Sequence, residues 1–211
     1  CLFETTEWEK PEAYPFTPKW PASPAVKIEA AWPSGQETDC SGVLVDETTV
    51  LTAAHCIFTH NVELCNGECS CWVENLQITA YQDSIKLDSG FIELLTWTAW
   101  TENRDYDYDL AGIKLDKHLG NDVGWLGFGY NNDNLFFSNK IFEHTSIIKN
   151  VLMDWSGTFT EIKDHHFYSD GPSSEGQAGA GAHRNEYDHI IYSVLSHHLD
   201  EGEFLTGHTR I

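Results

Sequence analysis

The chain consists of short β-rich segments separated by turn residues, and this pattern restricts its fold more than any other feature. Segments 41–46, 76–81 and 110–115 are rich in Val, Ile, Leu and Thr and lie between Gly, Ser, Asn and Pro turns. The same pattern predicts strands over 26–32, 49–54, 91–97, 140–152, 158–163 and 189–196. No stretch has the apolar periodicity of a four-turn helix. The sequence therefore predicts an all-β sandwich or barrel.

The domain organisation follows from length and from the distribution of proline. A chain of 211 residues fits one large β domain or two small barrels packed together. Residues 1–24 hold five of the seven prolines, which predicts an extended arm, either a pro-segment or a part of the mature protein. The turn-rich stretch 116–125 separates two halves of similar size. We expect one half over 25–118 and the other over 119–211.

The charge excludes some partners. Asp and Glu number 33 against 12 Lys and Arg, a formal net charge of −21. Non-specific binding to nucleic-acid phosphates needs a basic surface, and an anionic membrane surface repels this chain for the same reason. No apolar run approaches the roughly 18 residues of a membrane span. We expect a monomer with no nucleic-acid and no membrane partner. The simplest explanation of the acidity is a solubilising surface; alternative explanations are life in high salt, calcium-binding loops or an acidic compartment.

The cysteines indicate an oxidising compartment. There are six, an even number that suits a disulfide framework and a secreted or extracytoplasmic protein. A zinc site at Cys65, Cys69 and Cys71 is disfavoured because no second ligand pair follows at finger-like spacing. A lipidated Cys1 is also disfavoured, because it would leave an odd number of cysteines. Since the zinc site is disfavoured, we expect neither a metal nor a cofactor.

The segment CSGVLVDETTVLTAAHC, residues 40–56, carries the strongest chemical signal. Its apolar run delivers His55 from the end of a buried strand, immediately before Cys56. A disulfide between Cys40 and Cys56 would fix the backbone beside His55, and a catalytic histidine needs such fixing. The alternative is a buried histidine next to a structural disulfide.

Two weaker motifs follow along the chain. Asp109 precedes the apolar strand LAGIKL, where a buried carboxylate can accept a hydrogen bond from a histidine and fix its tautomer. Residues 169–181 form a Gly-rich segment, SDGPSSEGQAGAG, whose N–H groups can stabilise a developing negative charge. Taken singly, the Asp109 motif is equally consistent with a solvated acidic turn, and the Gly-rich segment is equally consistent with a plain loop.

In the order His, Asp, Gly-rich loop, the three motifs resemble those of the chymotrypsin/trypsin-like serine peptidases. LTAAHC resembles the histidine motif of that family, DLAGIKL its aspartate motif, and GQAGAG its G-x-S-G nucleophile loop. The resemblance covers about residues 24–211 and is closest to the glutamyl-endopeptidase-like secreted branch. It implies two antiparallel six-stranded-type β-barrels with the active site in the cleft between them.

The resemblance assigns roles to individual residues. It makes His55 the general base and acid, Asp109 its partner, and the N–H groups of Gly176 and Ala178 the oxyanion hole. Ala178 occupies the position of the nucleophilic serine and has no hydroxyl. Gln177 stands where trypsin-like zymogens have an aspartate that pairs with the new N-terminus, so we expect that activation switch to be absent.

The resemblance also places a specificity pocket. Its lining is expected from Pro172, Ser173, Glu175, Leu195, Ser196, His197 and His208. No acidic residue stands at Pro172, so a preference for Arg or Lys has no anchor. Glutamyl endopeptidases use a Ser or Thr with a His in this pocket, and Ser173 with a nearby histidine would permit a preference for Glu or Asp.

The resemblance leaves two main hypotheses. One is a serine endopeptidase in which the nucleophile is replaced by alanine, with a protein or peptide substrate and with its own pro-segment or a protein inhibitor as further partners. The other is a natural pseudoprotease that binds proteins or peptides, which Ala180 slightly favours. A third, a histidine-based metal or acid sensor, is disfavoured because adjacent histidines point to opposite faces of a strand.

Among the disulfides, we predict Cys40–Cys56. Cys69 and Cys71 are too close in sequence to bridge comfortably. We therefore expect Cys1 to pair with one cysteine of the 65–71 loop, and the other two to pair with each other.

Overall fold

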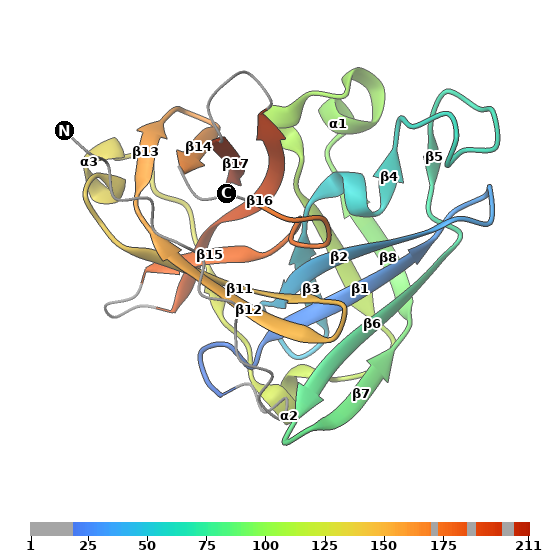
Figure 1. The fold of residues 1–211 in the computed structure, drawn as a ribbon, viewed down its shortest axis with the longest axis horizontal. Coiled ribbons are helices and arrows are strands. Elements are labelled where there is room, and N and C mark those ends of the chain that lie inside the picture. The colour runs from blue at the N-terminus through green and yellow to red at the C-terminus, as the bar shows by residue number, and fades with distance from the viewer. Residues whose placement is uncertain (1–18, 170–172, 185–188, 200–204) are drawn as a thin grey trace.

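The computed structural model describes residues 19–169, 173–184, 189–199 and 205–211. Within these ranges the protein is nearly all-β, with two curled antiparallel sheets side by side (Figure 1). This is the two-barrel arrangement that the family resemblance implies. The arm predicted over 1–24 lies mostly outside the described residues.

The first sheet has seven strands and uses the first half of the chain. In spatial order they are β7 (Ile85–Ser89), β6 (Asn75–Gln82), β1 (Ala25–Ala31), β2 (Glu37–Leu44), β3 (Thr49–Thr52), β9 (Ala111–Leu115) and β8 (Phe91–Thr96). Alternate side chains of these strands face one apolar core, which includes Val26, Ile28, Ile78 and Ile113. A separate two-stranded ribbon, β4 (Phe58–Thr59) with β5 (Cys71–Trp72), stands beside it.

The second sheet has eight strands from the second half of the chain. They run in the order β12 (Val151–Gly157), β11 (Phe142–Ile148), β15 (Gly181–Arg184), β16 (Ile190–Leu199), β17 (Leu205–Arg210), β14 (His166–Ser169) and β13 (Phe159–Ile162), with the short β10 (Gly127–Phe128) parallel to β16. Its core is aromatic, with Phe137, Phe142, Phe159 and Phe167 buried together.

One predicted strand is wrong. The segment 140–152 is not a single strand, because β11 and β12 form a hairpin in which Ile148 pairs with Val151. The intervening Lys149 and Asn150 have φ values of +49° and +62°. Two consecutive residues in this left-handed region make a tight turn whose twist matches that of the strands.

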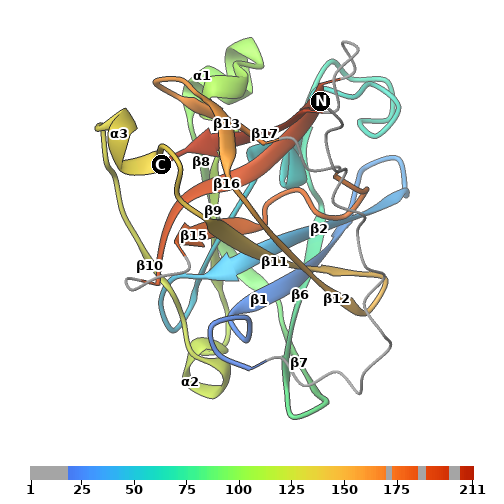
Figure 2. The ribbon, with the colours of Figure 1, turned by 60° about the vertical axis from the view of Figure 1, so that its left-hand side comes forward.

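The helices within the described residues are few and short. They are α1 (Thr98–Asn103), α2 (Gly120–Val123), α3 (Asn134–Phe137) and the 3₁₀ turns η1 (Ala54–Cys56) and η2 (Tyr106–Tyr108). Both ribbon views place α1 and α2 at opposite ends of the molecule (Figure 2). None of the helices in the described ranges has the length and apolar character needed to cross a bilayer.

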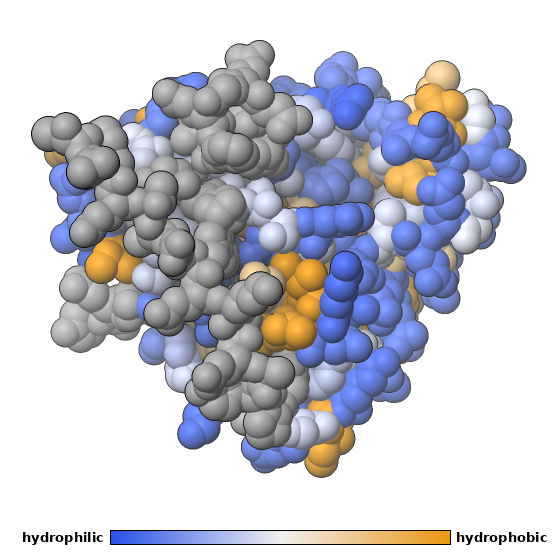
Figure 3. Space-filling view, in the orientation of Figure 1, coloured by the Kyte–Doolittle hydropathy of each residue, from blue (hydrophilic) through white to orange (hydrophobic). Residues whose placement is uncertain are grey.

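The two halves meet along a mixed seam. Strand β11 packs against β1 and β2, and Val43, Leu126 and Ile191 form an apolar cluster between the halves. Hydrophilic side chains cover much of the coloured surface in Figure 3, where hydrophobic patches are small and separate. Burial at the seam therefore holds the halves together, while the coloured part of the face in Figure 3 is mostly polar.

Candidate active site

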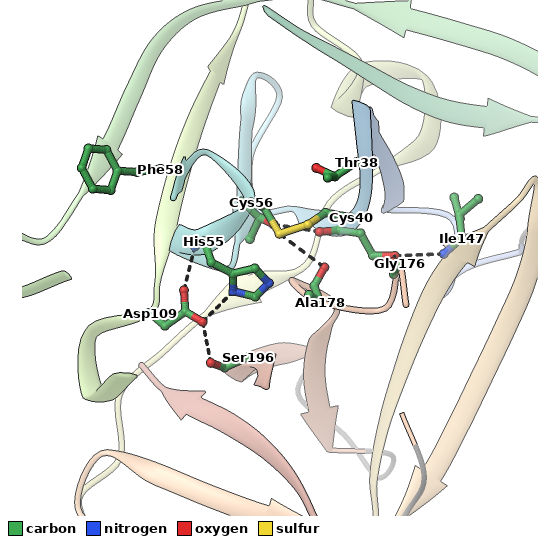
Figure 4. Close-up of a disulfide and its surroundings, with 12 residues drawn as sticks. Thr38, Cys40, His55, Cys56, Phe58, Asp109, Ile147, Gly176, Ala178 and Ser196 are labelled. Atoms are coloured by element: carbon green, nitrogen blue, oxygen red, sulfur yellow. Dashed lines mark hydrogen bonds and ion pairs between the residues drawn. A yellow bond between two sulfur atoms is a disulfide. The ribbon is translucent and has the colours of Figure 1, made fainter. Parts of the chain in front are cut away.

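His55 sits in the 3₁₀ turn η1, directly after strand β3. The Cys40–Cys56 disulfide predicted from the sequence is present and ties this turn to β2. His55 and Cys56 therefore have their backbone fixed by a covalent bond as well as by the sheet. Side chains of this site are drawn in Figure 4.

Asp109 comes from the segment between η2 and β9 and has no exposed surface. Its Oδ1 accepts the backbone N–H of His55 at 2.8 Å, and its Oδ2 lies 2.8 Å from Nδ1 of the His55 ring. A third hydrogen bond comes from the Ser196 hydroxyl, 2.5 Å from Oδ2. A buried carboxylate is stable only when its oxygens are satisfied in this way.

This arrangement fixes the tautomer of His55. An ionised carboxylate only accepts hydrogen bonds, so Nδ1 carries the proton and Nε2 has a free lone pair. Figure 4 shows the ring between Asp109 and Ala178. The His55 Nε2 is therefore on the side of the ring that faces Ala178.

The charges of His55 and Asp109 shift the pKa of both groups. Burial lowers the pKa of His55, but the Asp109 charge and hydrogen bond outweigh burial, so the His55 pKa is raised above 6.5. Burial raises the pKa of Asp109, but the His55 charge and the hydrogen bonds from His55 and Ser196 outweigh it, so the Asp109 pKa is lowered from 3.8. Asp109 is therefore ionised when His55 is neutral.

The loop that carries Ala178 rests on the first sheet at a glycine. Gly179 has a φ of +90°, and a Cβ built on it would collide with both the Ser41 carbonyl oxygen and the Thr52 Oγ1. Only glycine permits so close an approach and this backbone conformation. Gly179 therefore allows residue 178 to lie next to the strand that leads to His55.

Two polar contacts from Ser41 hold the same loop. The Ser41 backbone N–H donates to the Ala178 carbonyl at 2.8 Å, and its buried hydroxyl donates to the Gly176 carbonyl at 2.8 Å. The N–H groups of Gly176 and Ala178 donate no backbone hydrogen bond to another described residue. Ser41 therefore anchors the carbonyl side of both residues to the first sheet.

Gln177 has its side chain within its own loop. Its Oε1 accepts the Ser174 N–H at 2.6 Å, and the residue is almost completely buried. This hydrogen bond braces the loop from inside. A neutral amide has no charge with which to bind an N-terminal amine, so the absence of the zymogen switch stays an expectation.

A cleft of about 530 Å³ runs past His55 and Ala178. Ser173, Glu175, Leu195, Ser196 and His197, all predicted for the specificity pocket, line this cleft. The same cleft is also lined by Trp100, Arg104 and Tyr106 from the α1–η2 segment, and by Asn61 and Leu64 from the loop before β5. Pro172 lies outside the described residues.

Two predicted pocket residues have other surroundings. His208 is fully buried and faces the aromatic core of the second sheet, where its ring centroid lies 5.2 Å from that of Phe159. Successive residues of a strand point to opposite faces, so His208 and its neighbour Gly207 face opposite sides of β17. Ser196 lines the cleft, but its hydroxyl is bound to Asp109. Sequence reasoning missed that contact and also missed Ser41 beneath the loop. The only available signal was that both are small polar residues in strand-like segments.

The remaining cysteines fit the expected local pairing in part. Cys65 and Cys71 form a disulfide, which leaves Cys69 as the described cysteine with a free, exposed thiol. Cys1 lies outside the described residues, so its pairing with this loop stays a prediction, with Cys69 as the remaining partner.

Among the described residues, one set of three side chains could bring metal donors together. These are His55, Cys40 and Cys56, whose donor atoms lie within 4.8 Å of one another. The two sulfurs are bonded to each other in a disulfide, and metal binding requires thiolates. This set does not suit a metal ion.

Known proteins resemble this chain in sequence and in structure. An extracellular metalloprotease of Bacillus subtilis is 28% identical over 116 residues, which are 53% of this chain and 34% of that protein. A Glu endopeptidase structure superposes with a TM-score of 0.75 at 14% identity, covering 91% of this chain and 86% of that one. Protease Anisep of Arthrobacter nicotinovorans has a TM-score of 0.72 at 19% identity, covering 90% of each chain.

The chain thus spans about a third of the length of the relative from Bacillus, and the solved structures are similar in fold at low identity. The sequence profile of the trypsin family matches residues 17–139, more than half of the chain and including both His55 and Asp109. The chain therefore belongs to the trypsin family of serine peptidases, with a fold similar to that of a glutamyl endopeptidase.

Proposed function

We propose that this chain is the inactive Ser-to-Ala form of a secreted serine endopeptidase, with Ala178 at the nucleophile position. The observation that carries the proposal is the buried Asp109, whose three hydrogen bonds orient His55 toward residue 178. Two disulfides, and a relative named as extracellular, support secretion. The substrate is a protein or a peptide.

A serine at position 178 would complete the reaction path. Its Oγ would attack the carbonyl carbon of the peptide bond while Nε2 of His55 takes the hydroxyl proton. The N–H groups of Gly176 and of residue 178 would stabilise the oxyanion. His55 would then give its proton to the leaving amine, and a water molecule, deprotonated by His55, would hydrolyse the acyl-enzyme. Ala178 stops this sequence at its first step and leaves peptide binding intact.

The second candidate is a natural pseudoprotease that binds proteins or peptides. It is favoured by Ala180, which adds a second alanine where the glutamyl-endopeptidase-like branch often has serine. Retention of the His55–Asp109 pair and of the tight Gly179 contact favours the first candidate, because drift after lost catalysis has no reason to preserve them.

For specificity, we propose a preference for Glu or Asp before the cleaved bond. Ser173 lines the cleft, and His197 is the histidine of the predicted pocket whose side chain also lines it, whereas His208 is buried. Profiling an Ala178→Ser variant on peptide libraries tests this preference. Cleavage confined to bonds after Arg, Lys or bulky apolar residues would exclude it.

The direct test of the function is Ala178→Ser. Loss of the serine in a comparable triad costs on the order of 10⁶ in kcat, so restoration should raise peptide hydrolysis by several orders of magnitude. Because His55 must be neutral to accept a proton, and its pKa is raised above 6.5, activity should fall with pH as it passes below that pKa. The measurement is hydrolysis of a mixed peptide library across pH.

Two controls complete this test. His55→Ala on the Ala178→Ser background should abolish activity, and a phosphonylating reagent should label only variants that combine the Ala178→Ser change with an intact His55. A folded Ala178→Ser variant that neither cleaves nor becomes labelled would favour the pseudoprotease. The natural gene sequence at codon 178 then separates a replaced serine from a natural alanine.

A further inference from the structure

His197 stands one residue beyond the serine that binds Asp109. Strand β16 has a register shift against β17 between Leu195 and His197, so Ser196 is the extra residue of a bulge. The bulge turns the Ser196 hydroxyl toward Asp109, at 2.5 Å. Nδ1 of His197 lies 3.0 Å from the same hydroxyl oxygen.

The proton positions follow from this geometry. The Ser196 hydroxyl has one proton, and its short contact with an ionised carboxylate takes that proton toward Asp109. Toward His197 the oxygen can then only accept, so Nδ1 of His197 carries hydrogen and donates. Donation to a hydroxyl oxygen polarises the O–H bond and strengthens the hydrogen bond that this hydroxyl makes onward.

The His197 ring is held in place by its surroundings. A Cβ added at Gly207 would lie 2.8 Å from Cε1 of His197, so the ring lies directly on the glycine backbone. The ring centroid of Tyr106 lies 4.7 Å from that of His197, and the His166 ring packs edge-on against His197 with the two centroids 5.4 Å apart. Among the described residues, titratable groups that face His197 include Tyr106 from η2, His166 and Tyr168 from β14, and His208 from β17.

We propose that His197 is a positioning residue of the active site, whose Nδ1–H holds the Ser196 hydroxyl on Asp109 and thereby tunes the carboxylate that orients His55. Its catalytic consequence rests on the proposed function, but its effect on His55 does not. Since His197 also lines the cleft, a bound peptide would contact the residue that sets this chain of hydrogen bonds.

The test uses the chain with Ala178 and measures the titration of His55 by NMR. His197→Phe keeps a ring beside Tyr106 and Gly207 but removes the donor, and His197→Asn keeps an N–H near the position of Nδ1. Without the donor, Ser196 withdraws less charge from Asp109, so the measured His55 pKa should shift upward in the Phe variant. In the Asn variant it should stay near that of the parent protein.

A second readout is the low-field signal of the proton between His55 and Asp109. It should move in His197→Phe and not in His197→Asn. Gly207→Ala should reproduce the Phe effect, because the new Cβ displaces the His197 ring. His118→Gln, at an exposed site, should change nothing and serves as the control. If Phe and Asn variants give the same His55 titration and signal as the parent, the proposal is overturned.

Activity gives a final check on the Ala178→Ser background. Loss of one net hydrogen bond in the chain should lower kcat by roughly fivefold in His197→Phe, with recovery in His197→Asn, measured on a substrate without an acidic residue before the cleaved bond. Equal loss in both variants would argue against the donor role. Failure of Ala178→Ser to show any activity would count against the proposed function and leave the NMR result unaffected.

Discussion

The core of the first sheet is mainly aliphatic, whereas the core of the second sheet is mainly aromatic and adjoins buried histidines. All six cysteines lie within residues 1–71, so the second half of the chain contains none. His144 and His208 are buried beside the aromatic core, with rings 5.9 Å apart. Two halves with similar strand arrangements are therefore stabilised by different interactions.

The difference corresponds to what each half supplies to the site. The first half supplies His55 and Asp109, and the disulfide next to His55 fixes that region covalently. The second half supplies the loop with Ala178. Hydrogen bonds from Ser41 and the close contact of Gly179 hold this loop against the first half. The first half is thus covalently braced, and the second half depends on packing and on polar contacts across the seam.

The largest effect should come from Gly179→Ala, which attacks the seam between the halves. The added Cβ collides with the Ser41 carbonyl oxygen, in a backbone conformation that alanine disfavours. We expect a loss of about 4 kcal/mol in the free energy of unfolding, measured by denaturant titration. Gly35→Ala is the matched control, since Gly35 has a φ of +79° and no atom within 4 Å, and it should cost about 1 kcal/mol.

A Gly179→Ala variant as stable as Gly35→Ala would mean that the seam yields to the extra methyl group. The loop with Ala178 would then be less firmly seated than the contacts indicate.

The next effect concerns the covalent bracing of the first half. Cys40 and Cys56 are 16 residues apart, so replacing both by alanine should cost about 3 kcal/mol, because a disulfide stabilises more when it closes a longer loop. Cys65 and Cys71 are only 6 residues apart, so the same change there should cost about 2 kcal/mol. Thermal unfolding of both double variants measures the difference. The reverse order would show that loop length does not govern the stability of this half.

The smallest effect is a dependence of stability on pH that originates in the second half. Burial lowers the pKa of His144 to about 3 and that of His208 well below 6.5. From pH 6.5 down to pH 3 the unfolded chain binds a proton at His144 and the folded chain does not, so acid lowers stability. At pH 5 this amounts to about 2 kcal/mol for one histidine.

His144→Phe tests this origin, because it keeps a ring on Trp155, whose centroid lies 5.1 Å from that of His144, and removes the titrating group. The stability of this variant should fall less between pH 7 and pH 5 than that of the parent. Asp109 in the first half, with its pKa lowered from 3.8, begins to lose its contribution only in stronger acid. An unchanged pH slope in His144→Phe would place the acid sensitivity elsewhere.

The sequence by itself determined the strand-rich architecture and the Cys40–Cys56 disulfide, because apolar alternation and neighbouring residues in contiguous segments fix the local conformation. The pairing of His55 with Asp109, which are 54 positions apart, was predicted only from the resemblance of their motifs to those of a known family. The turn at Lys149 and Asn150 escaped prediction because its residues lack the usual glycine, and tertiary context holds them at positive φ.

Only the tertiary structure decided which buried polar residues support the site. Ser196 reaches Asp109 across 87 positions of sequence, and Ser41 reaches Gly176 across 135. A small polar residue in a strand has the same sequence pattern whether it faces a carboxylate, a carbonyl or water. His208 likewise faces the core rather than the cleft because the bulge at Ser196 and the alternation of β17 set its direction. Such contacts depend on how two sheets pack, and no local pattern records that packing.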